Sequence, residues 1–144
     1  MVGPSMKASS PWNRRWLCSA TVLLLLAGAC GGRDTPDDQQ LHRDVTNGAD
    51  GAEVTFDATV VNNPVESGGH ERFQVRAATG ERLEVDHNTT LAPSVPLHTG
   101  DAVVIHGRLY IDPGPTLGVH CTHAATSSGC PYPGWIEFRQ NYYE

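Results

Sequence analysis

The sequence of 144 residues predicts an all-β protein, namely a small five-stranded antiparallel barrel behind a signal peptide and a flexible tether. Three observations lead to this fold class. Beyond the first 30 positions, apolar residues fall in short runs that alternate with polar residues, as half-buried strands require. Fifteen glycines and ten prolines help to separate these runs. The length allows one small core and excludes a second.

Residues 1–29 have the organisation of a signal peptide. Three basic residues precede an apolar run from Leu17 to Leu26, and the small residues Ala27-Gly28-Ala29 follow. The run is well short of the roughly 20 residues that cross a bilayer, which favours a cleaved signal over a membrane helix. We therefore expect an exported protein.

The segment from Leu26 to Cys30 resembles the lipobox of bacterial lipoproteins, in which the cysteine becomes the first mature residue and carries lipid. It departs from that pattern at Ala27, where leucine is usual. A secreted or periplasmic soluble protein is the alternative, because Ala27-Gly28-Ala29 also fits an ordinary cleavage site. The polar stretch that follows favours the lipoprotein. Acyl chains on Cys30 would then anchor the protein to the outer face of a bacterial membrane.

The remaining cysteines predict a disulfide. Cys18 is lost with the signal and Cys30 goes to lipid, which leaves Cys121 and Cys130 as a pair in an oxidising compartment. Closing this loop would contribute about 2 to 3 kcal/mol to stability. A zinc site built from cysteine and histidine is the alternative for the same residues.

The charge of the mature chain limits the classes of partner that it is expected to bind. From Cys30 onward there are seven arginines, no lysine and all 16 acidic residues. A nucleic-acid partner is disfavoured, because phosphate contacts need a basic face. The partners that remain are the membrane, through the lipid anchor, and an unidentified small ligand or envelope protein.

Residues 30–51 predict the tether. They are rich in glycine, aspartate, glutamine and asparagine and show no sustained apolar period. A short helix from about Asp37 to Val45 is the alternative. The barrel domain then occupies residues 52–144.

Three strands are expected in the first half of this domain. They run from Glu53 to Val61, from Glu71 to Ala78 and from Arg82 to Asp86, and apolar residues alternate with polar ones in each. Thr79-Gly80 predicts a hairpin turn between the second and the third. Residues 87–99 contain two prolines and predict a connection.

Two further strands complete the barrel. The fourth runs from Ala102 to Ile111, and Gly107 on its apolar face predicts a bulge or a sharp bend. The fifth runs from Thr116 to Thr122. Five short strands with a connection after the third and a mid-strand glycine predict a barrel of the OB type, with a β-sandwich as the alternative.

A series of short motifs runs through residues 52–144: His70-Glu71-Arg72-Phe73-Gln74-Val75-Arg76, Gly80, His87-Asn88, Leu91-Ala92-Pro93, Gly100-Asp101, Val119-His120, Thr122-His123 and Gly134-Trp135. In this order they resemble the family called domain of unknown function 3465. The resemblance implies a small, mainly β, OB-like exported bacterial domain and no reaction. The chain departs from the family at Cys121, where an aromatic residue is usual, and near Cys130, where a further histidine is often found.

Candidate site residues come from these motifs. The four histidines are His70, His87, His120 and His123. Converging neutral imidazoles would bind zinc or another transition metal. The alternatives are a polar ligand pocket, for which Arg72 and Asn88 are further candidates, and hydrogen bonds that pin loops at the barrel rim. His120 and His123 would point to opposite faces of a regular strand, which argues for caution.

No arrangement for nucleophilic catalysis stands out, and no catalytic residue is assigned. The leading hypothesis is a membrane-tethered, extracytoplasmic binding or scaffold module that presents a histidine-bearing rim to its partner. One alternative is a metal-dependent hydrolase that uses the same histidines as ligands and Glu71 as base. The other is a purely structural envelope lipoprotein.

Overall fold

A computed structural model describes residues 1, 3, 32–113, 116–126 and 128–144. Apart from Met1 and Gly3, the expected signal peptide lies outside the described residues, as does the expected lipidation site Cys30. The chain from Gly32 onward forms one compact unit. Among the described residues, no helix has the length and apolar character needed to cross a membrane.

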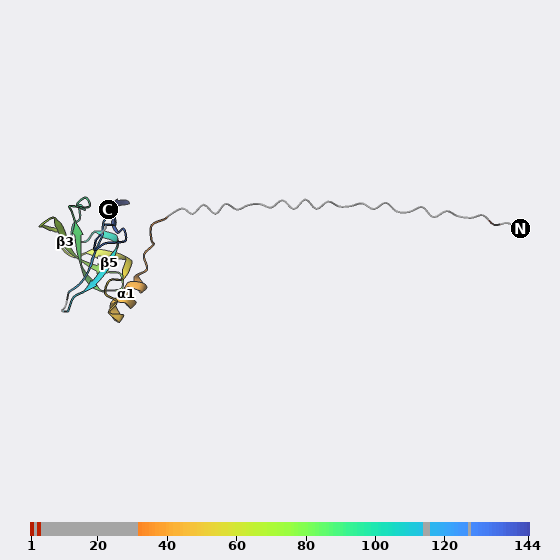
Figure 1. Cartoon of the computed structure of the whole chain (residues 1–144), viewed down its shortest axis with the longest axis horizontal. Coiled ribbons are helices and arrows are strands. Elements are labelled where there is room, and N and C mark those ends of the chain that lie inside the picture. The colour runs from red at the N-terminus through yellow and green to blue at the C-terminus, as the bar shows by residue number, and fades with distance from the viewer. Residues whose placement is uncertain (2, 4–31, 114–115, 127) are drawn as a thin grey trace. The chain divides into compact units, whose positions relative to one another are not determined.

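Five strands close into a barrel (Figure 1). They are β1 (Glu53–Val60), β3 (His70–Ala77), β4 (Arg82–Asn88), β5 (Ala102–Ile111) and β6 (Leu117–His120). Around the barrel the order is β1, β3, β4, β6 and β5, and β5 pairs with β1 to complete the ring. Closure confirms the OB-like barrel and excludes the β-sandwich.

One pair of barrel strands is parallel. Glu84 lies opposite Gly118 and Val85 opposite Val119 where β4 meets β6. The other pairings among the described strands are antiparallel. The prediction of a wholly antiparallel barrel is therefore wrong at this seam. The reason is topological, because a closed ring with an odd number of strands cannot alternate in direction at every step.

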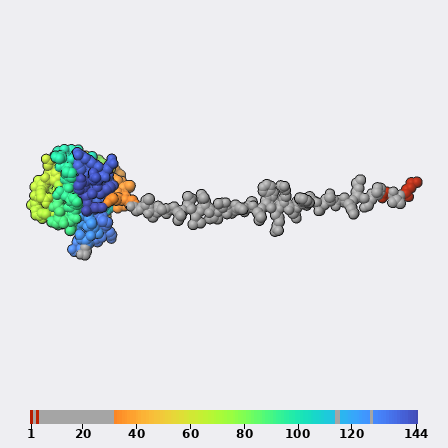
Figure 2. All heavy atoms as spheres, turned by 90° about the horizontal axis from the view of Figure 1, so that it is seen from above, coloured from red at the N-terminus to blue at the C-terminus, as the bar shows by residue number. Residues whose placement is uncertain are grey.

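Three short strands lie outside the ring and were not expected from the sequence. They are β2 (Val65–Ser67), which pairs with β3, and the C-terminal hairpin of β7 (Trp135–Phe138) and β8 (Asn141–Tyr143). The hairpin is attached to the barrel through β7, which pairs with β5. Figure 2 shows the last residues, in dark blue, beside the orange start of the unit, where the Arg33 guanidinium lies 3.8 Å from the centre of the Tyr142 ring.

The core follows the predicted alternation. The inward side chains of every barrel strand are buried, while their neighbours along the strand are mostly partly or fully exposed. The largest apolar side chains with almost no exposed surface are Phe56, Phe73, Leu41, Leu83, Ile105, Leu109 and Ile136. Period-two burial thus fixes which side chains of each strand reach the outer surface.

A helix replaces much of the expected tether. α1 (Asp38–Asn47) begins after Asp37, whose carboxylate accepts a hydrogen bond from the Gln40 amide at 2.8 Å, and ends at Gly48 in the left-handed region. Leu41 is completely buried against the barrel core. The prediction of a flexible tether over residues 30–51 is wrong for this segment. The alternative of a short helix from about Asp37 to Val45 is confirmed instead. Its apolar period is weak because Leu41 is the one fully buried residue of the helix.

Gly107 marks a change of partner along β5. Residues 104–106 pair with β7, and residues 108–111 pair with β6. The register with β1 runs through Gly107 without an inserted residue, so the predicted bulge is absent. A Cβ atom at this position would lie 2.5 Å from the His120 carbonyl oxygen. Glycine is therefore required here by the close approach of the chain leaving β6.

Truncating the helix anchor tests whether α1 is an integral part of the fold. Leu41→Ala removes a fully buried side chain and should lower the free energy of unfolding by about 2–5 kcal/mol. Arg43→Ala, on the exposed side of the same helix, should change it by less than about 0.5 kcal/mol. Denaturant titration of both variants measures the difference. Equal stabilities would show that the helix is not part of the core.

Candidate functional site

Four barrel strands place polar side chains on one side of the barrel, which we call the outer face. The outer face comprises His70, Arg72, Glu84, Asp86, Arg108, Tyr110 and His120. The register sets their neighbours: Arg72 lies opposite Asp86, and Arg108 lies opposite His120. β4 and β6 pair in parallel up to Val85 and Val119, so the next residues of the two strands, Asp86 and His120, follow side by side. Seven residues from four strands thus share one surface.

Asp86 is the centre of this surface. One carboxylate oxygen accepts a hydrogen bond from His70 Nδ1 at 2.7 Å, and the other accepts one from Arg72 Nη2 at 3.2 Å. The bond to Asp86 raises the pKa of the Arg72 guanidinium. It also fixes the orientation of the His70 ring, whose side chain is 34% exposed. His70 therefore offers a pre-oriented hydrogen-bonding group at a partly exposed position.

Tyr110 reaches across β6 to β4. Its hydroxyl donates a hydrogen bond to Glu84 Oε1 at 3.1 Å. The ring lies over Gly118, where a Cβ atom would stand 2.2 Å from the ring carbon Cζ. Burial, followed by the charge of Glu84, raises the pKa of the Tyr110 phenol, which therefore remains a donor at neutral pH. Glycine at position 118 is what allows the ring to lie flat on the barrel.

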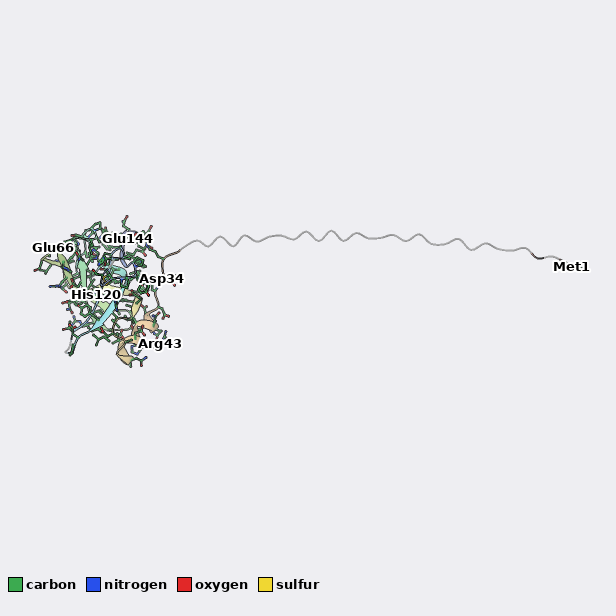
Figure 3. All side chains as sticks on the ribbon, in the orientation of Figure 1. Met1, Asp34, Arg43, Glu66, His120 and Glu144 are labelled. Carbon is green, nitrogen blue, oxygen red and sulfur yellow. A yellow bond between two sulfur atoms is a disulfide. The ribbon has the colours of Figure 1, made fainter. Side chains whose placement is uncertain are left out.

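His120 borders a hollow in the outer face. Its ring packs edge-on against Tyr110, with ring centres 5.6 Å apart, and it is labelled in Figure 3. The hollow has a volume of about 300 Å³ and is lined by Asp50, Gly51, Arg108, Leu109, Tyr110, Asp112 and His120. Burial, and then the positive charge of Arg108, lowers the pKa of His120. The imidazole is therefore neutral at neutral pH and can both donate and accept a hydrogen bond.

The structure places His87 elsewhere. It is completely buried, its Nε2 donates a hydrogen bond to the Pro93 carbonyl at 3.0 Å, and its Nδ1 accepts one from the Thr122 hydroxyl at 2.8 Å. The ring therefore holds together β4, the connection after β4 and the segment after β6. Both ring nitrogens are engaged, so His87 has no lone pair left for a metal ion.

Two other predicted site residues also have local structural partners. His123 is buried and its Nδ1 donates a hydrogen bond to the Ala124 carbonyl at 2.8 Å. The Asn88 side-chain oxygen accepts hydrogen bonds from the amide and the hydroxyl of Thr90, which closes a turn. The outer face thus unites His70, Arg72 and His120, and the expected convergence of four imidazoles is wrong. His87 is not part of the outer face, because its side chain points into the barrel.

Glu71 is neither a solvated strand end nor a free base. Its carboxylate is buried and accepts a hydrogen bond from the Val95 amide at 3.0 Å. Burial raises the pKa of this carboxyl group. Glu71 therefore fastens the connection between β4 and β5 to the barrel.

Four members of the outer face were missed from the sequence: Glu84, Asp86, Arg108 and Tyr110. Each has the outward parity of its strand, and that parity was visible in the alternation. The missing information was the pairing of β4 with β6, because sequence periodicity does not say which strands are neighbours.

Cys121 and Cys130 form the predicted disulfide, with an S–S distance of 2.03 Å and Cα atoms 5.4 Å apart. Among the described residues, one group has the side chains and spacing of a metal site, and it consists of His120 and these two cysteines. The disulfide occupies both sulfurs. In this oxidised form the alternative zinc site is therefore not available.

Comparison with known proteins adds no family to this description. A scan against protein-family models finds no match, and a search of curated proteins finds no relative. The resemblance to domain of unknown function 3465 therefore stays a prediction.

The buried imidazole of His87 predicts how stability depends on pH. Burial lowers its pKa in the folded protein below the value of about 6.5 that it has when unfolded. The unfolded chain then binds a proton more readily, so the free energy of unfolding should fall as the pH drops below about 6.5. Melting temperatures measured from about pH 8 to pH 5 test this expectation.

A matched pair of variants isolates the contribution of His87. His87→Gln keeps one donor and one acceptor but cannot be protonated, so it should flatten the loss of stability below about pH 6.5. His98→Gln changes a side chain that is 77% exposed and should leave the wild-type slope. The same slope in both variants would contradict the assignment.

Proposed function

We propose that the protein is a membrane-tethered, extracytoplasmic binding module that holds a small, uncharged, hydroxyl-rich ligand on its outer face. An oligosaccharide of the cell envelope is the ligand class that this chemistry fits. The cluster in which His70 and Arg72 both bond to Asp86 is the observation that carries the proposal. It is a set of polar groups that is held in place and partly exposed.

The charge of the outer face favours an uncharged ligand. The two arginines, Arg72 and Arg108, are balanced by the two carboxylates of Glu84 and Asp86, and His120 is neutral. Asp50 and Asp112 in the lining of the hollow add negative charge, which disfavours an anionic ligand. The outer face offers guanidinium and imidazole donors beside carboxylate and imidazole acceptors, and sugar hydroxyl groups both donate and accept hydrogen bonds.

The position of the face on the barrel supports the same ligand class. OB barrels bind oligonucleotides or oligosaccharides across the surface of their second and third strands. In this barrel those strands are β3 and β4, which carry His70, Arg72 and Asp86. The acidic chain disfavours the nucleic acid, which leaves the saccharide.

The proposed location outside the cytosol is supported by the disulfide and by the N-terminal sequence. A disulfide persists in oxidising compartments, so the Cys121–Cys130 bond favours a site outside the cytosol. The signal-like segment and the lipobox-like Cys30 point the same way. The metal-dependent hydrolase has less support, because His87 lacks a free ring nitrogen.

Saccharide titration tests the binding proposal. We expect chito-oligosaccharides, added to isotopically labelled protein, to shift the backbone amide resonances of β3, β4 and β6. Asp86→Asn should weaken binding by about tenfold or more, because it releases His70 and Arg72 from their shared acceptor. Asp57→Asn, an exposed change on β1, is the matched control and should bind like the wild type.

The result can also contradict the proposal. No shift with chito-oligosaccharides or with an uncharged glucan would leave the structural lipoprotein as the better account. Shifts centred on the separate hollow lined by Asp34, Gln40 and His106 would place binding on another face.

The proposed anchor has its own test. Cys30→Ser removes the expected lipid acceptor and should move the protein from the membrane fraction to the soluble fraction. Cys18→Ser, within the expected signal, should leave fractionation unchanged. If both variants remain with the membrane, lipidation at Cys30 is not the anchor.

A further inference from the structure

The disulfide lies at the edge of the outer face. Cys121 directly follows His120, the last residue of β6, and its partner Cys130 stands nine positions later. In Figure 2 the mid-blue part of the chain that contains this loop projects from the body of the unit. Three metal-binding side chains therefore meet where the surface is accessible.

A ring nitrogen of His120 and the two sulfurs all lie within 4.8 Å of one another. We propose that these three groups form a redox-controlled metal site, in which reduction of the disulfide allows His120, Cys121 and Cys130 to bind a thiophilic ion such as Zn²⁺. Two sulfurs and one imidazole nitrogen are a ligand set that zinc prefers, with a fourth position left for water or a further ligand. The proposal does not depend on saccharide binding.

The chemical steps balance with a dithiol as the reductant. A reduced dithiol, such as the active site of a thiol–disulfide oxidoreductase, gives two electrons and two protons to the Cys121–Cys130 bond. The S–S bond breaks, two thiols form, and the dithiol becomes a disulfide. Zinc then replaces the two thiol protons, which are released to solvent, and the two thiolates balance the charge of the ion.

The backbone around the cysteines is held by contacts other than the disulfide. The Thr126 amide donates a hydrogen bond to the Cys130 carbonyl at 2.8 Å, and the Gly134 amide donates one to the His123 carbonyl at 2.8 Å. Gly134 also packs on the Cys121 backbone, since a Cβ atom there would lie 1.9 Å from the Cys121 oxygen. Breaking the S–S bond therefore leaves the two cysteines close together.

The sulfurs have a short distance to travel. In a tetrahedral zinc site the two sulfurs stand about 3.7 Å apart, given Zn–S bonds of about 2.3 Å. In the oxidised protein they are bonded to each other, and the imidazole nitrogen is already within 4.8 Å of both. Rotation of the cysteine side chains on a backbone with Cα atoms 5.4 Å apart covers this change. His120 and Cys130 are half-buried, so the ion can approach from solvent.

Zinc stoichiometry of the oxidised and reduced chain tests the proposal. The full chain carrying Cys18→Ser and Cys30→Ser, purified in detergent, has no thiols other than the two at issue. After reduction with a phosphine and anaerobic dialysis against Zn²⁺, it should hold about one zinc per chain. The same chain left oxidised should hold less than about a tenth of this amount. Cobalt in place of zinc should give thiolate-to-cobalt absorption in the reduced form alone.

Variants assign the nitrogen ligand. In the reduced protein, His120→Ala should lower zinc affinity by at least about tenfold, whereas the exposed control His98→Ala should not. Circular dichroism follows the fold in every sample. The proposal is overturned if reduction adds no zinc, if oxidised and reduced chains bind it equally, or if His120→Ala binds like the wild type. It is also overturned if the reduced chain unfolds and zinc does not restore it.

Discussion

The parallel seam between β4 and β6 is the constraint on which the outer face depends. It inserts β6 between β4 and β5, so that residues 84 and 85 stand beside residues 118 and 119, and Asp86 comes close enough to His120 for its charge to act on the imidazole. Without this insertion Asp86 and His120 would not be neighbours, and Tyr110 could not reach Glu84 across Gly118. A ring of five strands requires at least one such parallel contact, and in this barrel it runs through the middle of the polar surface.

Closure of the ring also separates the histidines into two classes. Side chains with inward parity lose contact with water, and His87 is accordingly neutral and bonded at both nitrogens. Most side chains with outward parity keep contact with water, and His70 and His120 retain the capacity to bind a partner. His106 is the exception, because it is buried beside Trp135 and hydrogen-bonded to the Thr55 hydroxyl. The same alternation that builds the core therefore decides which imidazoles stabilise the fold and which are available for function.

Much of the barrel could be predicted from the sequence, because a half-buried strand shows its period of two residue by residue. The strand that ends at Val60, the hairpin at Gly80 and the long run into Ile111 all lie where alternation placed them. α1 was expected only as the alternative to a tether because Leu41 is its one fully buried residue, and β7 escaped because its four residues show no clear alternation. The candidate site was found in part. His70, Arg72 and His120 lie in recognisable motifs, but Asp86 becomes their centre through strand pairing, which sequence periodicity does not encode.

Nuclear Overhauser spectroscopy in solution tests the parallel pairing of β4 with β6 directly. The account predicts nuclear Overhauser contacts between β4 and β6 in the parallel register, from Glu84 to Gly118 and from Val85 to Val119. It also predicts that the α-protons of Gly118 are shifted upfield by the ring of Tyr110 that covers them. An antiparallel pattern between these strands, or no contact between them, would contradict the closed ring and remove the basis of the outer face.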